Sequence, residues 1–364
     1  MEGFLFLPHP ILMTKAEKIA QFDPNGPGQL GSNLFGLPFN AEESDIVIIP
    51  VPWEVTVSYG GGTAEGPAAI LEASLQVDLY DPDSPEAWKS GIHLLPEDEE
   101  IKEQSLVLRD RAELHIEALS KGTPHEHGEE LLATISSACE QMNSSVESVC
   151  SKWLDAGKLV GLLGGDHSTP LGFMQALAKR YPSFGILQID AHMDLRIAYE
   201  GFTYSHASIM YNALKIPQVT QLVQVGIRDF CEEEIHVMKN HSPRVKTFFD
   251  DQLKFNAYNG TTWKDQVAEI ISHLPQHVYV SFDIDGLDPK LCPNTGTPVA
   301  GGLEYHQAVY LLGELARSGK EIIGFDLNEV APGEDEWDAN VGARLLFKLC
   351  VFAGISKGLF QAAR

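Results

Sequence analysis

Residues 278–285, Val-Tyr-Val-Ser-Phe-Asp-Ile-Asp, decide the fold of this chain. The run is mostly apolar and ends in two acidic residues. Runs of this kind are typical of strands that are buried on both faces of a parallel sheet. In open α/β sheets, ligands bind beyond the carboxyl ends of the strands. The run therefore predicts a central strand with Asp283 and Asp285 at the ligand-binding edge.

Five other apolar runs have the same character and alternate with segments of helical composition. The runs begin near Ile46 (IVIIPV), Leu159 (LVGLLG), Gly185 (GILQID), Leu222 (LVQVGI) and Ile322 (IIGFDL). The helix-like segments cover residues 66–76, 131–156, 171–179, 262–273 and 305–318. Alternating strands and helices predict a mostly parallel central sheet with helices on both faces. Because the sequence shows no linker and no internal repeat, we expect a single three-layer α/β/α domain.

Two parts of the chain depart from this pattern. Residues 1–40, with GPGQLG at 26–31, are expected to form an N-terminal arm that packs on the domain at 41–364 or on a neighbouring subunit. A polar insertion is expected near residues 82–130, followed by a helix. It contains the triplet His125-Glu126-His127, which we interpret as part of a solvated segment. A metal-binding role for these two histidines is the alternative.

Composition excludes several classes of protein. The 364 residues include 51 acidic and 26 basic side chains, a formal net charge of −25. A surface with this much negative charge repels phosphate backbones and anionic lipids. We therefore expect neither nucleic acid nor a membrane as a partner. We recognise no run of the about 18 apolar residues that cross a bilayer. The five cysteines are scattered without C-x-x-C spacing, and residues 1–12 lack the basic region of a signal peptide. We expect a cytoplasmic protein.

Acidic and imidazole side chains gather at the ends of three predicted strands. Gly-Gly-Asp-His-Ser follows one strand at 164–168, and Asp-Ala-His-Met-Asp follows another at 190–194. Alternate residues of an extended backbone project to the same side, so the side chains of each motif can converge. The predicted cluster has four carboxylates and two imidazoles: His167, Asp190, His192, Asp194, Asp283 and Asp285.

Such a cluster predicts two divalent cations. Four carboxylates held together without counter-charge repel one another and take up protons. Two divalent cations balance the four negative charges and lower the pKa of a bridging water toward about 7. Oxygen and imidazole ligands without thiolate favour Mn²⁺, with Ni²⁺ as an alternative.

The three motifs together resemble the arginase/agmatinase/formiminoglutamase superfamily of ureohydrolases, and the agmatinase-like branch in particular. The resemblance extends from about residue 45 onward and includes TGTPV at 295–299, GGL at 301–303 and GFDLNEVAP at 324–332. It implies an arginase-like fold. It also implies a binuclear-metal hydrolase that cleaves the C–N bond of a guanidino or other linear amidine substrate.

The resemblance also implies roles for individual residues. One metal ion would be held by His167, Asp190, Asp194 and Asp283, and the other by Asp190, His192, Asp283 and Asp285. Asp194 would accept a hydrogen bond from the bridging hydroxide. His206 would pass a proton to the leaving amine, for which a pKa near the working pH is suited. Glu329 would bind the substrate guanidinium. The alternatives are that His206 is an ordinary surface or packing histidine and that Glu329 forms a structural ion pair. Asp166 is expected to orient His167 or to cap a helix.

The substrate is less well defined by the resemblance. Arginases have an Asn where this chain has Arg196, and an Asp where it has Cys231, and both differences count against arginine. In formiminoglutamases an Arg in the position of Arg196 meets a carboxylate. Trp53 and Tyr59 are candidates for aromatic walls around a planar cation, with core or subunit-contact roles as the alternative.

Several functions therefore stay open. The segment at 52–63, the N-terminal arm and the insertion resemble the longer guanidine hydrolase branch, so agmatinase and guanidine hydrolase are nearly equal interpretations. Formiminoglutamase and guanidinobutyrase follow. A two-metal phosphoesterase is disfavoured by the acidic composition, and a catalytically silent metal-binding subunit by the presence of all six predicted ligands. The expected partner is a small cationic guanidino substrate, and the resemblance implies a homotrimer or homohexamer.

Overall fold

The computed structural model describes residues 13–123 and 127–363. Within these residues eight strands form one sheet in the order β2-β1-β3-β8-β7-β4-β5-β6, and every neighbouring pair is parallel. The strands are β1 Ile46–Val51, β2 Ile92–Leu94, β3 Leu159–Gly164, β4 Phe184–Ile189, β5 Val219–Ile227, β6 Val245–Phe249, β7 His277–Asp283 and β8 Glu321–Asn328. The parallel sheet is confirmed.

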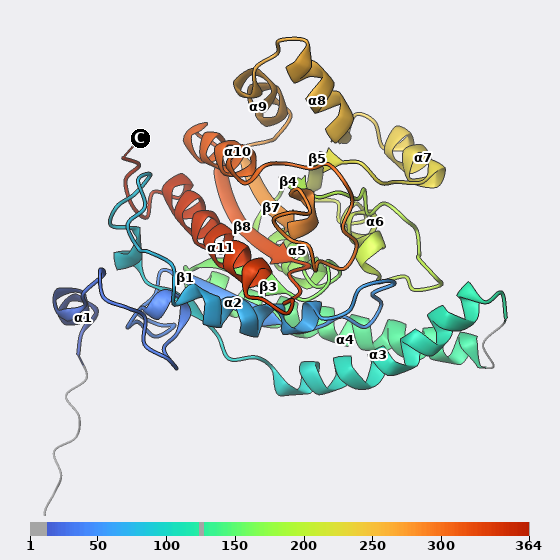
Figure 1. Ribbon diagram of the computed structural model, residues 1–364, viewed down its shortest axis with the longest axis horizontal. Helices are drawn as coiled ribbons and strands as arrows, with labels where there is room; N and C mark the ends of the chain where they lie inside the picture. Colours follow the sequence, from blue (N-terminus) through green and yellow to red (C-terminus); the bar gives the residue numbers. More distant parts are fainter. Residues whose placement is uncertain (1–12, 124–126, 364) are drawn as a thin grey trace, which may run out of the picture.

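Helices cover both faces of this sheet (Figure 1). They are α1 Lys15–Gln21, α2 Gly66–Ser74, α3 Glu99–Ser120, α4 Gly128–Asp155, α5 Leu171–Arg180, α6 Ile209–Ala213, α7 Glu232–Asn240, α8 Asp250–Tyr258, α9 Trp263–Ser272, α10 Tyr305–Arg317 and α11 Trp337–Ser356. Successive strand residues point to opposite faces. In β1, Ile46 and Ile48 belong to the buried cluster that includes residues of α2, α10 and α11, whereas Val47 and Ile49 belong to the cluster that includes residues of α3, α4 and α5. The three-layer α/β/α architecture is confirmed.

Some elements were missed because their sequence signals are weak. β2 has three residues, and β6 at the opposite edge of the sheet is only partly buried. Helix α11 is apolar on nearly all sides, so it lacks the one-sided pattern of a surface helix. By length and composition alone it is able to cross a membrane. However, 72% of its most apolar window is buried, and the helix packs on β8, α2 and α10 as a core helix does.

The irregular regions of the sequence contribute to the core. Phe35, in the expected N-terminal arm, is buried, and its ring centroid lies 4.9 Å from that of Phe347 in α11. The expected insertion supplies β2 and the long helix α3, which runs beside α4 (Figure 1). His125 and Glu126 lie outside the described residues. The division into an arm at 1–40 and a domain at 41–364 stays a prediction.

The strand order brings the predicted motifs to one edge. Strands β3, β8, β7 and β4 are neighbours, and because all are parallel their carboxyl ends lie on the same side. Asp283 at the end of β7 pairs in register with Asn328 at the end of β8. The residues that follow these four strands therefore meet at the centre of the sheet edge.

Candidate active site

His167 lies at the centre of the predicted cluster. Its Nδ1 atom is 3.0 Å from Asp190 Oδ2, 3.1 Å from Asp194 Oδ2 and 3.3 Å from Asp283 Oδ2. All four side chains are buried. Three carboxylates from two strand ends thus converge on one imidazole nitrogen.

A second group adjoins the first. His192 Nδ1 lies 3.0 Å from Asp285 Oδ2 and 3.6 Å from Asp190 Oδ1. The ligand atoms of Asp190, His192 and Asp285 lie within 4.8 Å of one another, as do those of His167, Asp190 and Asp283. Asp190 therefore belongs to both groups. The structure brings all six predicted side chains together.

The electrostatics of the cluster fit divalent cations. Burial, with the charges of Asp285 and Asp190, raises the pKa of Asp283 well above its usual range. Burial and Asp190 raise the pKa of Asp194 to about 8. His167 Nδ1 is buried without a hydrogen-bond partner among the described residues, although it faces three carboxylate oxygens. Buried charges are normally paired or bound to metal, and this donor set of oxygen and imidazole nitrogen suits a divalent cation.

A hydrogen-bond chain behind His167 fixes its ring. His167 Nε2 lies 2.9 Å from Ser281 Oγ, and Ser281 Oγ donates to Asp326 Oδ1 at 3.1 Å. Such partners orient imidazole ligands and make them more basic. Asp166 was expected to orient His167 or to cap a helix. Its Oδ1 accepts hydrogen bonds from the backbone N–H and hydroxyl of Ser168 and has none from the His167 ring among the described residues. Ser281 and Asp326 were missed by the sequence analysis. The signal available was a polar residue inside an apolar strand.

A row of buried polar side chains supports Asp190. Gln188 Nε2 donates to Asp190 Oδ2 at 2.8 Å, Gln224 Nε2 donates to Gln188 Oε1 at 2.7 Å, and Thr247 Oγ1 donates to Gln224 Oε1 at 2.8 Å. The row crosses β4, β5 and β6. Gln224 also donates to the carbonyl of Met193 at 2.7 Å, so the same amide holds the loop that carries His192.

Glu329 lies directly beside the cluster. Its Oε1 accepts the backbone N–H of His167 at 2.8 Å, and its own carbonyl accepts the Thr295 hydroxyl at 2.8 Å. The residue adopts φ 63°, a strained left-handed conformation that these contacts maintain. Burial and the charge of Asp166 raise the pKa of Glu329 well above its usual range. A carboxyl in this state gains from a cationic partner such as a guanidinium.

The loop after Asp194 carries the other candidates. The Arg196 guanidinium lies 4.6 Å from the Tyr199 ring centroid, and the Tyr199 ring is 6.1 Å from that of His206. Burial, with the charges of His192 and His167, lowers the pKa of His206 to about 3. This shift favours the neutral imidazole, whereas the sequence analysis expected a pKa near the working pH.

Buried Glu234 connects two of the predicted substrate contacts. Its Oε2 accepts the backbone N–H of Cys231 at 2.9 Å and lies 3.9 Å from Arg196 Nε. Its Oε1 accepts the backbone N–H of Leu195 at 3.1 Å. Arg196 and Cys231 are therefore held on adjoining loops. Glu234 itself was missed by the sequence analysis.

The two aromatic candidates lie in opposite environments. Trp53 is fully buried in the core between the sheet and helices α3 and α4. Its carbonyl accepts the backbone N–H of Asp166 at 2.8 Å. It therefore packs as a core residue, the alternative interpretation given above. Tyr59 is 83% exposed.

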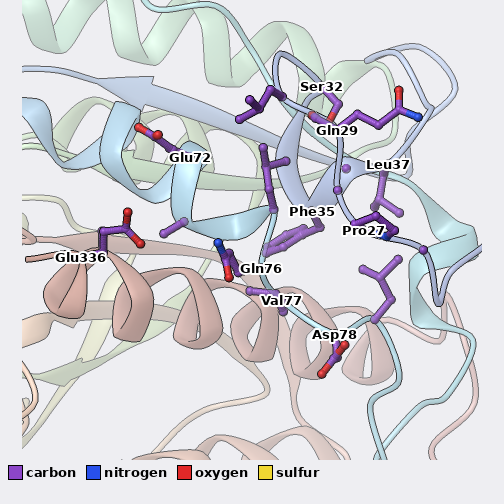
Figure 2. A pocket seen from close by; sticks show the side chains of 18 of the residues that line it. Pro27, Gln29, Ser32, Phe35, Leu37, Glu72, Gln76, Val77, Asp78 and Glu336 are labelled. Carbon is purple, nitrogen blue, oxygen red and sulfur yellow. The ribbon is translucent and has the colours of Figure 1, made fainter.

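A cavity of about 1270 Å³ lies elsewhere, between the chain at 21–38, helix α2 and the segment at 332–339. Figure 2 shows Phe35, Val77 and Glu72 among its walls. Among the described residues that line it, none belongs to the carboxylate–histidine cluster. The cavity is separate from the candidate active site.

Known proteins resemble this chain over most of its length. Residues 44–351 match the family described as Arginase family. The N(1)-aminopropylagmatine ureohydrolase of Thermus thermophilus is 30% identical over 317 residues, 87% of this chain and 93% of that protein. The agmatinase of Bacillus anthracis is 32% identical over 298 residues, covering 82% and 87%. The agmatine ureohydrolase structure of Thermoplasma volcanium has a TM-score of 0.67 at 23% identity, covering 89% and 94%.

Proposed function

Because this chain belongs to the arginase family, we propose that it hydrolyses the C–N bond of a guanidino compound and releases urea. The convergence of six predicted ligand side chains on one sheet edge carries the proposal. Relatives that cover most of the chain are named for reactions of this class. A catalytically silent subunit would have little need for a complete cluster.

The cluster would hold two divalent ions. His167, Asp194, Asp190 and Asp283 would bind one, and His192, Asp285, Asp190 and Asp283 the other. When bound, these ions would supply the positive charge that makes water nucleophilic at neutral pH. Mn²⁺ is the proposed metal and Ni²⁺ the alternative, since the oxygen-rich ligand set lacks thiolate.

The remaining residues would bind the substrate and move the proton. Glu329 would pair with the guanidinium and hold its central carbon toward the cluster. Asp194 would orient the attacking water. His206, neutral before the reaction, would accept a proton released by that water and return it to the departing nitrogen. With guanidine and water as reactants, the products are urea and ammonia.

Arg196 favours a substrate without a second positive charge. Its guanidinium stacks on Tyr199 and lies 3.9 Å from the Glu234 carboxylate, and Tyr199 in turn contacts His206. A cation that Glu234 partly balances therefore stands near His206. Agmatine carries an additional ammonium that Arg196 repels, whereas guanidine does not, and 4-guanidinobutyrate carries a carboxylate that Arg196 attracts. We therefore place guanidine and 4-guanidinobutyrate ahead of agmatine, the substrate in the names of two of the relatives.

Urea release from a substrate panel tests the proposal. The protein is loaded separately with Mn²⁺ and Ni²⁺ and offered guanidine, 4-guanidinobutyrate, agmatine, N(1)-aminopropylagmatine and arginine. Formamide release from formiminoglutamate is measured in parallel. We expect urea from guanidine or 4-guanidinobutyrate at a higher kcat/KM than from agmatine. The reverse order contradicts the role of Arg196, and no product from any compound with either metal contradicts the proposed reaction.

We propose two further properties. A cytoplasmic location is favoured by the composition, with its five scattered cysteines that lack C-x-x-C spacing. A homotrimer or homohexamer follows from the family resemblance, and sedimentation velocity measures it directly.

A further inference from the structure

Helix α3, which comes from the expected polar insertion, contacts two loops that lead to the candidate active site. One face of the helix is buried, and its residues recur every three or four positions: Ile101, Ser105, Leu108, Ala112 and His115. Such spacing places them along a single stripe. Arg109 stands at the border of this stripe, with its side chain 12% exposed. The polar members of the stripe contact two separate loops.

The first loop is the segment at 54–63. Ser105 Oγ accepts the backbone N–H of Glu54 at 3.0 Å. Arg109 donates to the carbonyls of Val57 and Val55, the latter at 3.4 Å, and also pairs with Glu113 at 3.0 Å. Further along, Gly60 donates to the carbonyl of Gly296 at 3.1 Å.

That contact leads to the proposed substrate acid. A side chain at Gly296 would stand 3.1 Å from Glu329 Oε2, so the backbone of this residue closely approaches the carboxyl. The segment at 54–63 is thus held by α3 at one end, and at the other it is hydrogen-bonded to Gly296, whose backbone lies beside the Glu329 carboxyl.

The second loop is the segment at 196–206. His115 Nε2 donates to the carbonyl of Glu200 at 3.0 Å, and the His115 ring meets the Phe202 ring edge-on at 5.5 Å. Tyr199 and Phe202 exchange backbone hydrogen bonds of 3.0 and 2.8 Å, which close a tight turn. Glu200 within that turn has φ 52°, a conformation that needs outside support. The Tyr199 ring also makes a T-shaped contact with the His206 ring, with 6.1 Å between the centroids.

The positive charge of Arg109 also acts on the second loop. It contributes to lowering the pKa of His206 and opposes the rise in pKa that burial causes at Glu200. Both residues belong to the segment at 196–206, whereas the hydrogen bonds of Arg109 are with the segment at 54–63.

We propose that α3 is a positioning helix for the reaction, in which Arg109 holds the segment at 54–63 and His115 holds the segment at 196–206. Together they would set the distance between the Glu329 carboxyl and His206. Neither residue would touch substrate. The catalytic part of this inference rests on the proposed function; the structural part does not.

Two variants and their rescues test the inference. Arg109→Met keeps most of the aliphatic stem but removes both carbonyl contacts, and Arg109→Lys restores a donor. His115→Phe keeps the ring beside Phe202 but removes the N–H, and His115→Gln restores it. Arg111→Met is the matched control, because Arg111 is an exposed cation on the same helix. Each variant is loaded with Mn²⁺ and examined by hydrogen–deuterium exchange, metal analysis and steady-state kinetics.

The expected results separate positioning from general stability. Arg109→Met should raise amide exchange at 54–63 and His115→Phe at 196–206, with two metal ions per chain retained. Because small misplacement is costly, kcat should fall by roughly 10- to 100-fold in both, and the rescue variants should recover part of it. Arg111→Met should match the wild type.

Other outcomes overturn the inference. Unchanged exchange in both segments shows that α3 does not hold them, whether or not a substrate is known. Faster exchange with an unchanged kcat removes the link to catalysis. If Arg109→Met does not fold, Arg109→Lys and the two His115 variants still test whether α3 holds the two segments. If the wild-type protein has no activity on the substrate panel, the proposed function is overturned. The exchange results then still test whether α3 holds the segments at 54–63 and 196–206.

Discussion

The backbone N–H of His167 donates to Glu329 Oε1 at 2.8 Å, so a proposed metal ligand and the proposed substrate acid are joined by one hydrogen bond. The two residues are 162 positions apart in the sequence. They meet because β3 and β8 are neighbours in a parallel sheet and each residue follows the end of its strand. The same geometry that collects the carboxylates also aims Glu329 at them.

Replacing His192 by Ala should abolish urea release and weaken metal retention. His192 lies 3.0 Å from Asp285 and is the sole imidazole of its predicted ligand group. Metal content after dialysis, measured by elemental analysis, should fall from two ions per chain toward one. His236→Ala is the control, since its side chain is 64% exposed. Full activity in His192→Ala would overturn the mechanism.

Glu329→Gln should lower kcat/KM without unfolding the protein. Gln keeps the oxygen that accepts the His167 N–H but loses the charge that pairs with a guanidinium. Hydrogen bonds to charged groups contribute about 1.5–3 kcal/mol, so a loss of roughly 10- to 100-fold is expected. Initial rates over a range of guanidine concentrations measure it. Exposed Glu336→Gln serves as the control, and equal values for the two variants would remove Glu329 from substrate binding.

His206→Asn should lower kcat and leave KM nearly unchanged. Asn retains a polar group of similar size but does not take up protons. General acid–base catalysis contributes about 10²- to 10⁴-fold, which bounds the expected loss. An unchanged rate, or a loss confined to KM, would assign His206 to another role.

The stability of the metal-free protein should fall as pH rises from about 4 to 8. Asp194 has its pKa raised to about 8, and the pKa of Asp283 is also raised. A group with a raised native pKa binds more protons folded than unfolded, so stability decreases with pH between the two pKa values.

The His167 imidazole adds to this slope at the alkaline end. Burial lowers its pKa, but Asp190, Asp194 and Asp283 more than offset this and hold it well above the usual range. Thermal unfolding of chelator-treated protein at several pH values measures the trend. Mn²⁺ should remove it, and a metal-free Tm that rises with pH over this window would contradict the electrostatic account.

Gln224→Leu should destabilise the fold and loosen the site. The substitution leaves Gln188 and Thr247 without their buried partner, and an unsatisfied buried polar group costs about 1–3 kcal/mol. Denaturant unfolding measures the loss, and metal release after dilution into chelator should quicken. Gln221→Leu on the same strand is the control, because the hydrogen bond from its side-chain amide to the Pro243 carbonyl is exposed to solvent.

The sequence predicted that the six side chains converge, because their residues follow strand ends directly. The alternation of side chains along an extended strand does not by itself explain this convergence, because Asp194 has φ 56° and residues 284–286 form a short 3₁₀ turn. The chain bends at both places, and the side chains converge through these bends as well as through strand periodicity.

The supporting residues were harder to predict. Gln188 lies in β4 and Gln224 lies in the neighbouring strand β5. Nothing in the local sequence shows that the two side chains meet. Arg109 and His115 belong to a polar helix, where charged and imidazole side chains are usually solvated. Their roles depend on contacts with loops 50 to 85 positions away, which only the tertiary structure supplies.

The claim on which the rest depends is that the six side chains bind two cations. Anomalous diffraction from crystals grown with Mn²⁺, recorded at the manganese absorption edge, tests it directly. Two peaks are predicted, one between His167 and Asp283 and one between His192 and Asp285, with Asp190 contacting both. Density in which these side chains are hydrogen-bonded to one another, with no anomalous peak among them, would contradict the account.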